Sequence, residues 1–165
     1  MINNLGAKYV ILGHSENRAN GDTDIIINKK INSALKQKLT VIFCIGETIF
    51  QKKRKETNKI IRKQITQGLK GFKKNSRIII AYEPVWSIGT GIIPKNHELE
   101  KNIKFINSAI SKNTKLRKIK ILYGGSVNPK NIQSLNAINM LDGYLIGGAS
   151  QNAKKLIDIV RKSYN

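Results

Sequence analysis

Two side chains that can exchange protons stand directly after apolar segments of the sequence. Glu83 follows the apolar run 78–82, and Pro84 fixes the direction in which the chain leaves it. His14 follows the apolar run 9–12 after a single glycine. A carboxylate held against apolar walls loses hydration, which favours its protonated form and makes it a better base. The pair indicates general acid–base chemistry, with a salt-bridged glutamate and a structural histidine as the simpler alternatives.

Glycine-rich segments follow three of the apolar runs. They are residues 87–91 (Ser-Ile-Gly-Thr-Gly), 124–126 (Gly-Gly-Ser) and 147–148 (Gly-Gly). Glycine lets the backbone turn and bring its N–H groups close to a ligand. A single Gly-Gly pair is typical of any turn, but three such segments at successive strand ends favour a cradle for a phosphate group.

Five apolar runs are expected to form the strands that carry these groups. They are residues 9–12, 40–45, 78–82, 119–123 and 144–146. The runs are continuous rather than alternating, which is typical of strands covered on both faces. Amphipathic segments separate them, so we expect a βα unit repeated five times, with parallel strands and right-handed crossovers. No linker divides the chain, and residues 1–165 are expected to form one domain.

Periodic apolar residues define the expected helices. Their stripes are Ile27, Ile31 and Leu35; Ile61, Ile65 and Leu69; Leu99, Ile103, Ile106 and Ile110; and Ala153, Leu156, Ile157 and Val160. Asn96 and Asn128 are expected to cap helix starts. In folds of this kind the loops after the C-terminal ends of the strands carry the chemistry, so the acid–base pair and the glycine segments are expected on one rim.

The chain is strongly basic, with 30 Lys and Arg against 10 Asp and Glu and a formal net charge of +20. A/T-rich codons explain the abundance of Lys, Ile and Asn without selection for charge, and the aromatic residues are too sparse, at 6%, for a base-stacking platform. Nucleic-acid binding is therefore not expected. No run approaches the ~20 apolar residues of a membrane span, and no secretion leader is visible. The single cysteine, Cys44, suits a reducing cytoplasm and is expected to be a packed thiol rather than a nucleophile.

Five segments, taken in order, resemble one enzyme family. They are residues 6–16, 44–47, 81–91, 123–127 and 142–150. Together they are similar to the triosephosphate isomerases, and the resemblance runs from Leu5 to the C-terminus. It implies an α/β fold, an incomplete TIM barrel with five consecutive βα units of eight. It also implies an isomerase that interconverts dihydroxyacetone phosphate and D-glyceraldehyde 3-phosphate through an enediolate, in glycolysis and gluconeogenesis.

The resemblance implies roles for individual residues. Glu83 is expected to be the base, His14 a neutral electrophile that polarises the carbonyl oxygen, and Glu16 a further catalytic residue. Backbone amides of Gly89, Ser126, Gly147 and Gly148 are expected to bind the substrate phosphate. The expected lid consists of Pro84, Val85, Trp86, Ser87, Ile88, Gly89, Thr90 and Gly91. The resemblance implies no metal, no cofactor and no membrane association. It implies a cytoplasmic protein that forms a homodimer.

The sequence departs from the family pattern in several places. The first three βα units of the family, which precede His14, have no counterpart in this sequence. They would supply a strand ending in Asn-x-Lys, whose lysine neutralises the phosphate and pairs with Glu16, and a loop that makes most of the dimer contact. Asn17 stands where the family usually has arginine, and residues 92–94 (Ile-Ile-Pro) replace a more polar lid hinge.

Three hypotheses follow. The chain is a truncated triosephosphate isomerase; or it is an inactive remnant, or a half that needs a separate N-terminal piece; or, less favoured, it is a basic nucleic-acid-binding protein. Five parallel strands cannot close with the geometry of an eight-stranded barrel. The strands at 9–12 and 144–146 are therefore expected to leave open edges, and open edges recruit other chains. We expect the polypeptide alone to self-associate or to be partly unfolded.

Overall fold

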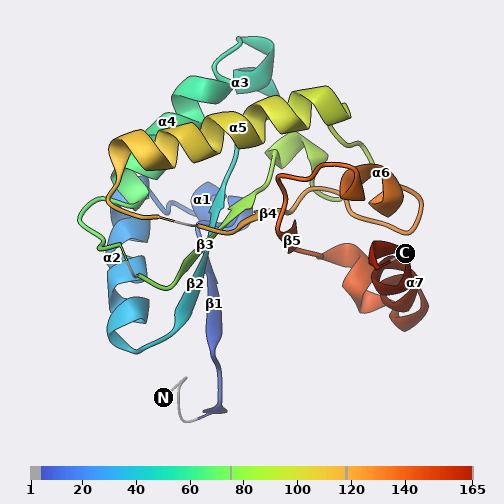
Figure 1. The fold of residues 1–165 in the computed structure, drawn as a ribbon. Helices are drawn as coiled ribbons and strands as arrows, with labels where there is room; N and C mark the ends of the chain where they lie inside the picture. The colour runs from blue at the N-terminus through green and yellow to red at the C-terminus, as the bar shows by residue number, and fades with distance from the viewer. Residues whose placement is uncertain (1–4, 75, 118, 165) are drawn as a thin grey trace.

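One parallel sheet organises the protein. The computed structural model describes residues 5–74, 76–117 and 119–164, and five strands in this part of the chain form a single sheet in chain order (Figure 1). They are β1 (Tyr9–Leu12), β2 (Thr40–Ile45), β3 (Ile78–Tyr82), β4 (Ile121–Tyr123) and β5 (Gly143–Tyr144). Each strand pairs in parallel with the next. The predicted α/β fold of five consecutive βα units is confirmed.

Two strand boundaries differ from the expected ones. β4 begins at Ile121 rather than at residue 119, and the Asp142 carboxylate accepts the Ile121 N–H at 2.8 Å. The Ile121 N–H would otherwise make the first hydrogen bond between β4 and β5, but it donates to this side chain instead. β5 covers Gly143–Tyr144 rather than residues 144–146, although the Leu145 N–H still donates to the Tyr123 carbonyl at 2.9 Å. An edge strand with one neighbour has few ladder bonds to define its length.

Helices follow the strands in the expected alternation. The α-helices are α1 (Ser15–Ala19), α2 (Asp24–Lys36), α3 (Ile49–Lys53), α4 (Thr57–Gly68), α5 (Asn96–Asn113), α6 (Ile132–Asn136) and α7 (Ala153–Ser163). Two short 3₁₀ turns, η2 (Val85–Ser87) and η3 (Gly148–Gln151), follow β3 and β5. Across the described ranges, none of the helices combines the length and apolar character needed to cross a membrane.

The two asparagines expected to cap helices have other partners. Lys95 is the residue that precedes α5, and the Asn96 side chain instead donates to the Ser134 carbonyl at 3.0 Å. Asn128 accepts the N–H groups of Lys130 and Asn131 in a turn, and α6 begins only at Ile132. Both side chains bind backbone groups, but neither caps a helix: Asn96 connects α5 to α6, and Asn128 stabilises a turn.

One face of the sheet and the helices outside it form the core. Val41 and Phe43 of β2 and Ile80 of β3 are fully buried. The helices contribute Ile27, Ile31, Ile61, Ile65, Leu99, Ile103, Ile106 and Ile110, all at most 4% exposed. Figure 1 shows α2, α4 and α5 in an arc along this side, with α6 and α7 beyond β5. The stripes expected in α4 and α5 are confirmed. In α2, Ile27 and Ile31 are buried as expected, but Leu35 is half-buried and Ala34 is the buried residue of the last turn.

The stripe expected in α7 is wrong in part. Ile159 is the buried residue of this helix, whereas Ile157 and Val160 are 49% and 47% exposed. Because α7 lies at the end of the sheet, it packs along one narrow line rather than against two neighbours. A pattern of apolar residues alone does not show how much of a helix surface finds a partner.

The opposite face of the sheet is less covered than the apolar strands suggest. Ile11, Ile42 and Ile79 share this face by register, and the described helices pack on the other side. Ile42 and Ile79 are half-buried, and on the edge strand Tyr9 and Ile11 are 60% and 45% exposed. The described helices therefore cover one face of the sheet and not both, contrary to the expectation. The open edges of the described sheet are β1 and β5.

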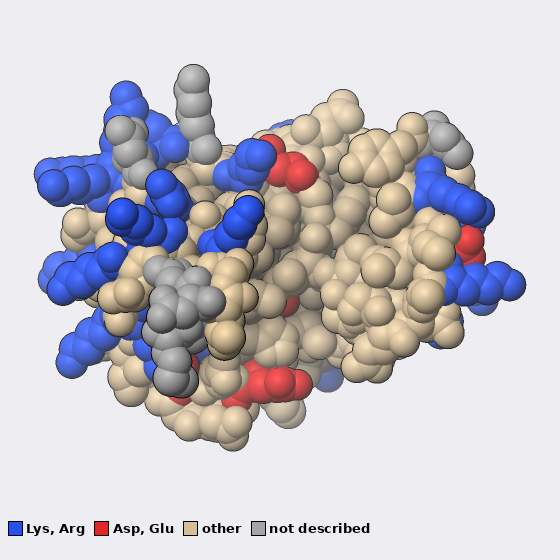
Figure 2. All heavy atoms as spheres, turned by 90° about the horizontal axis from the view of Figure 1, so that it is seen from below, with Lys and Arg blue, Asp and Glu red and all other residues tan. Residues whose placement is uncertain are grey.

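On the face shown in Figure 2, the charged side chains do not form one basic stripe. Seen from below, lysines and arginines gather at the end of the molecule where α2 lies and recur at the opposite end, with a largely uncharged area between them (Figure 2). A nucleic-acid backbone favours a continuous positive surface. The distribution agrees with the expectation that the charge is spread over helix faces.

We expect Ile11→Lys to weaken self-association of the chain, because it places a charge on the exposed face of an edge strand. The matched control is Ile25→Lys on α2, where the isoleucine is 61% exposed but lies away from the sheet edge. Sedimentation velocity should show an association constant about tenfold lower for Ile11→Lys than for Ile25→Lys, which corresponds to about 1.4 kcal/mol in the free energy of association. Equal association of the two variants would show that this edge is not the contact.

Candidate active site

A cavity of about 660 Å³ opens at the C-terminal ends of the strands. It is lined by seven residues that the sequence predicted for the site: His14, Glu83, Ile88, Gly89, Ser126, Gly147 and Gly148. These residues come from the segments after β1, β3, β4 and β5. The structure therefore brings together the acid–base pair and the glycine segments on one rim.

Glu83 is the buried carboxylate of the cavity. It is 4% exposed, and its Oε2 atom has no hydrogen-bond partner among the described residues. Burial raises the pKa of Glu83, while a hydrogen bond from the Cys44 thiol and the proximity of His14 and of the Arg18 guanidinium oppose this rise. A carboxylate with a raised pKa and an unoccupied oxygen is suited to take a proton from a ligand.

Two glycines make room for Glu83. A Cβ on Gly124 would lie 2.6 Å from the Glu83 Cγ and 2.8 Å from its Oε1, and a Cβ on Gly46 would run into the Glu83 carbonyl oxygen. Both contacts are closer than van der Waals distance. The glycine at each position therefore lets the neighbouring strand ends approach Glu83.

His14 presents its Nε2 atom to Glu83. The Nε2–Oε1 distance is 3.9 Å, and the His14 Nδ1 atom accepts the Glu16 N–H in a long contact of 3.5 Å that caps α1. When Nδ1 accepts, the proton of a neutral imidazole is on Nε2. This tautomer directs a hydrogen-bond donor into the cavity, where it can polarise a ligand oxygen.

Glu16 lies beside His14 but outside the cavity lining. Its Oε2 is 3.8 Å from the His14 Nδ1, and its side chain is 85% exposed. Its described contacts thus connect it to the histidine and not to the space where a ligand would lie.

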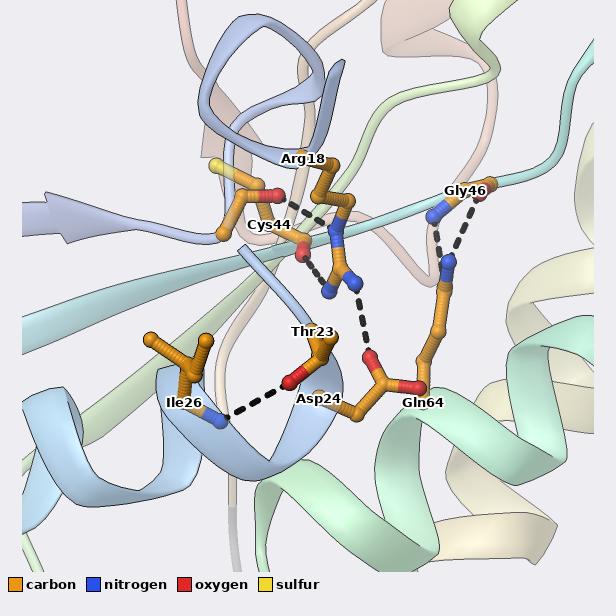
Figure 3. Close-up of polar contacts among 8 residues, drawn as sticks. Arg18, Thr23, Asp24, Ile26, Cys44, Gly46 and Gln64 are labelled. Atoms are coloured by element: carbon orange, nitrogen blue, oxygen red, sulfur yellow. Dashed lines mark hydrogen bonds and ion pairs between the residues drawn. The ribbon is translucent and has the colours of Figure 1, made fainter. Parts of the chain in front are cut away.

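Arg18 fixes the chain segment that carries His14 (Figure 3). Its guanidinium donates to the carbonyl oxygens of Gly13 at 2.7 Å and Cys44 at 3.1 Å, and it forms an ion pair with Asp24 at 2.6 Å. These contacts join the ends of β1 and β2 to the start of α2. The planar guanidinium satisfies several acceptors at once, which holds the residue before His14 in place.

Gln64 performs the same task at the end of β2. Its side-chain amide accepts the Gly46 N–H at 2.9 Å and donates to the Gly46 carbonyl at 3.0 Å (Figure 3). Both groups are buried, so without Gln64 two backbone groups would lack a partner. Because Gly46 contacts the Glu83 backbone, the α4 side chain also supports the position of the carboxylate.

The expected lid, residues 84–91, lies against the segment after β4. The Gly91 N–H donates to the Ser126 Oγ at 2.9 Å, and the Ser126 N–H donates to the Ser87 carbonyl at 3.1 Å. The Ser126 amide is therefore bonded to the lid and not directed at a ligand. This differs from the expected amide role of Ser126, which in this arrangement anchors the lid.

A buried hydroxyl joins the first turn of the lid to the residue that follows the lid. The Ser87 Oγ donates to the Ile92 carbonyl at 2.5 Å and lies 2.8 Å from the Tyr123 hydroxyl of β4. Ser87 is fully buried. A Cβ on Gly125 would run into both hydroxyls, so glycine is required beside this pair. The sequence shows these residue types but not that they meet.

A second buried carboxylate lies behind the lid. Glu47 is 1% exposed and accepts hydrogen bonds from the Trp86 Nε1 at 3.0 Å and the Tyr82 hydroxyl at 3.1 Å. The Tyr82 hydroxyl in turn accepts from Asn102 Nδ2 at 2.9 Å. Burial raises the pKa of Glu47, and the donors from Trp86 and Tyr82 oppose this rise. Glu47 belongs to the segment 44–47 that carries the family resemblance, but the sequence does not show its hydrogen bond to the lid residue Trp86.

Two lysines line the cavity in addition to the predicted residues. Lys130 follows the Gly-Gly-Ser segment after β4, and Lys155 lies in the first turn of α7. Neither lysine follows a strand directly, so the sequence analysis did not identify them as cavity residues. Their position a few residues after the glycine segments is the signal that could have identified them.

Cys44 is 1% exposed at the end of β2, as expected for a packed thiol. Burial, together with the neighbouring Glu83 carboxylate, raises the pKa of Cys44 well above its usual range. A thiol held in this form is a poor nucleophile.

We expect Glu83→Gln to stabilise the protein at neutral pH. Because the carboxyl pKa is raised in the folded state, the protonated form of Glu83 is compatible with folding and its charged form destabilises the fold. The stability that protonation gives is present at low pH and is lost as the pH rises through the folded-state pKa. Thermal unfolding at pH 7 should show a gain of about 1 kcal/mol for the variant. The gain should shrink as the pH is lowered through the raised pKa; a gain independent of pH would contradict the assignment.

Comparisons with known proteins agree with this geometry. The family model described as triosephosphate isomerase matches residues 1–163. The chain is 42% identical over 164 residues to the triosephosphate isomerase of Thermodesulfovibrio yellowstonii, covering 98% of this chain and 67% of the relative. It is 42% identical over 169 residues to that of Geotalea uraniireducens, covering 99% and 67%. For Mycoplasma mobile the identity is 41% over 162 residues, covering 98% and 65%.

The chain thus spans about two thirds of the length of the curated relatives it matches. The match is continuous through the five strands and includes every residue of the cavity rim. The chain belongs to the triosephosphate isomerase family.

Proposed function

We propose that His14 and Glu83 carry out the proton transfer of triose phosphate isomerisation on this chain. The observation that supports this most directly is the pairing of a buried carboxylate, with one oxygen unoccupied, and an imidazole Nε2 at 3.9 Å in one cavity. The reaction moves one proton between adjacent carbons and needs one base and one electrophile. Both groups are supplied by the protein.

The chemistry assigns one step to each residue. The Glu83 carboxylate takes the proton from the carbon beside the substrate carbonyl, and the electron pair of that C–H bond forms the enediolate. The His14 Nε2–H donates to the oxygen on which negative charge develops. Glu83 then returns the proton to the neighbouring carbon, while the hydroxyl proton passes from the first oxygen to the former carbonyl oxygen, so that the carbonyl now stands on the first carbon. Glu16 contributes only through His14, because its side chain points to solvent.

The phosphate would lie against the glycine segments. Gly89, Gly147 and Gly148 line the cavity, and η3 begins at Gly148, so backbone amides of this turn are available to phosphate oxygens. Ser126 anchors the lid beside them. A closed lid removes water from the site, which strengthens each electrostatic contact with the enediolate.

Cellular location and assembly follow the family resemblance. We infer a cytoplasmic protein that acts on a small phosphorylated sugar, and a homodimer as its assembled state. The dimer proposal depends on βα units that the resemblance places before His14.

Assays of isomerisation test the proposal. The purified chain is measured alone and after mixing with a polypeptide that supplies the three βα units which the family resemblance places before His14. In the preparation that turns over, Glu83→Gln should lower kcat by about 10³-fold, because it removes the general base. The substitution keeps the size of the side chain, so the cavity is conserved.

The control is Glu100→Gln, which removes a carboxylate from α5, outside the cavity lining. Equal rates for Glu83→Gln and the unchanged chain would overturn the assignment. Absence of turnover in the mixture, with both polypeptides folded, would favour the inactive remnant.

A further inference from the structure

Lys52 is in contact with the aromatic residue of the lid. Its Nζ atom lies 3.7 Å from the centroid of the Trp86 ring, and the same atom is 2.7 Å from the Glu98 Oε1 of α5. The Lys52 and Glu98 side chains are 28% and 33% exposed. The ammonium is therefore partly removed from water and paired with a carboxylate while it faces the ring.

Trp86 is thus held from two directions. Its Nε1 donates to Glu47 at 3.0 Å, while Lys52 lies over the face of the ring. A cation is attracted to the negative face of an aromatic ring, most strongly for tryptophan. Trp86 lies in η2, directly after Glu83 and Pro84, so a contact that fixes the ring also fixes the first turn of the lid.

The helix that carries Lys52 is itself well anchored. α3 begins with a capping box, in which the Thr48 side chain accepts the Gln51 N–H and the Gln51 side chain accepts the Thr48 N–H. Lys52 lies in its last turn, where a positive charge is favourable. Glu98 approaches from the first turn of α5, so the ammonium joins two helices above the lid.

We propose that Lys52 is a positioning residue of the lid, whose ammonium, held by Glu98, keeps the Trp86 ring against α3 and α5 and thereby stabilises the lid arrangement in which Gly91 bonds to Ser126. This inference rests on the proposed function, because it assigns residues 84–91 as the lid of the phosphate site. Its direct consequence is that the Trp86 ring is less accessible when Lys52 is present.

Trp86 is the single tryptophan of the chain, so tryptophan fluorescence comes from this ring alone and reports on its surroundings. We expect Lys52→Met to raise the Stern–Volmer constant for acrylamide quenching by about threefold, in line with loss of one partly desolvated cation–π contact. Lys53→Met is the matched control, because Lys53 is the next residue of α3 and is exposed. Circular dichroism verifies that both variants keep the helix content of the unchanged chain.

Further variants separate the contact from a general effect on stability. Lys52→Arg should restore quenching close to that of the unchanged chain, because it keeps a cation over the ring, and Glu98→Gln should give an intermediate increase. Added salt should increase quenching of the unchanged chain and leave Lys52→Met unaffected, since a partly exposed ion pair is screened. Equal quenching of Lys52→Met and Lys53→Met, or failure of Lys52→Arg to restore it, would overturn the proposal.

Inorganic phosphate distinguishes this inference from the proposed function. If the lid closes over a phosphate site, phosphate should change the Trp86 emission of the unchanged chain, and Lys52→Met should need about threefold more phosphate for half of that change. Wild-type emission that is insensitive to phosphate would count against the phosphate site. Altered quenching in the phosphate-free Lys52→Met variant would still support the contact.

Discussion

The arrangement of the site depends on keeping one carboxylate buried, in contact with two neighbouring strand ends and without a partner for one of its oxygens. Glu83 satisfies this condition because Gly46 and Gly124 leave space for its backbone and side chain. A larger residue at either position would push Glu83 or the strand ends apart. The position of His14 at 3.9 Å then follows from how β1 is held against β2.

Polar side chains from the surrounding helices maintain these strand ends. Arg18 and Gln64 bind backbone groups of Gly13, Cys44 and Gly46, which lie beyond the regular ladder. A buried backbone group without a partner destabilises the fold, so each of these contacts stabilises the rim as well as orienting it. The strand ends that carry the proposed chemistry are therefore held by side chains of α1 and α4. The lid, in contrast, is held by a few replaceable contacts.

The sequence predicted the parts of the fold that depend on local pattern. β1, β2 and β3 match the apolar runs, and His14 and Glu83 were identified by their position after β1 and β3. β4 and β5 were placed less well, because Asp142 takes the Ile121 N–H and because an edge strand has one neighbour. The contacts of Trp86 and Ser87 could not be predicted, since they join residues 36 to 39 positions apart in the chain.

The two buried carboxylates show why burial alone does not identify a base. Burial raises the pKa of both Glu47 and Glu83. Glu47 accepts hydrogen bonds from Trp86 and Tyr82, so both donors stabilise its charged form, and their hydrogen bonds would weaken if it took a proton. Glu83 has an oxygen with no donor in the described structure, and this oxygen can bind a proton without breaking an existing contact. The proposed proton transfer is therefore assigned to Glu83, whereas Glu47 accepts hydrogen bonds from the Trp86 and Tyr82 side chains.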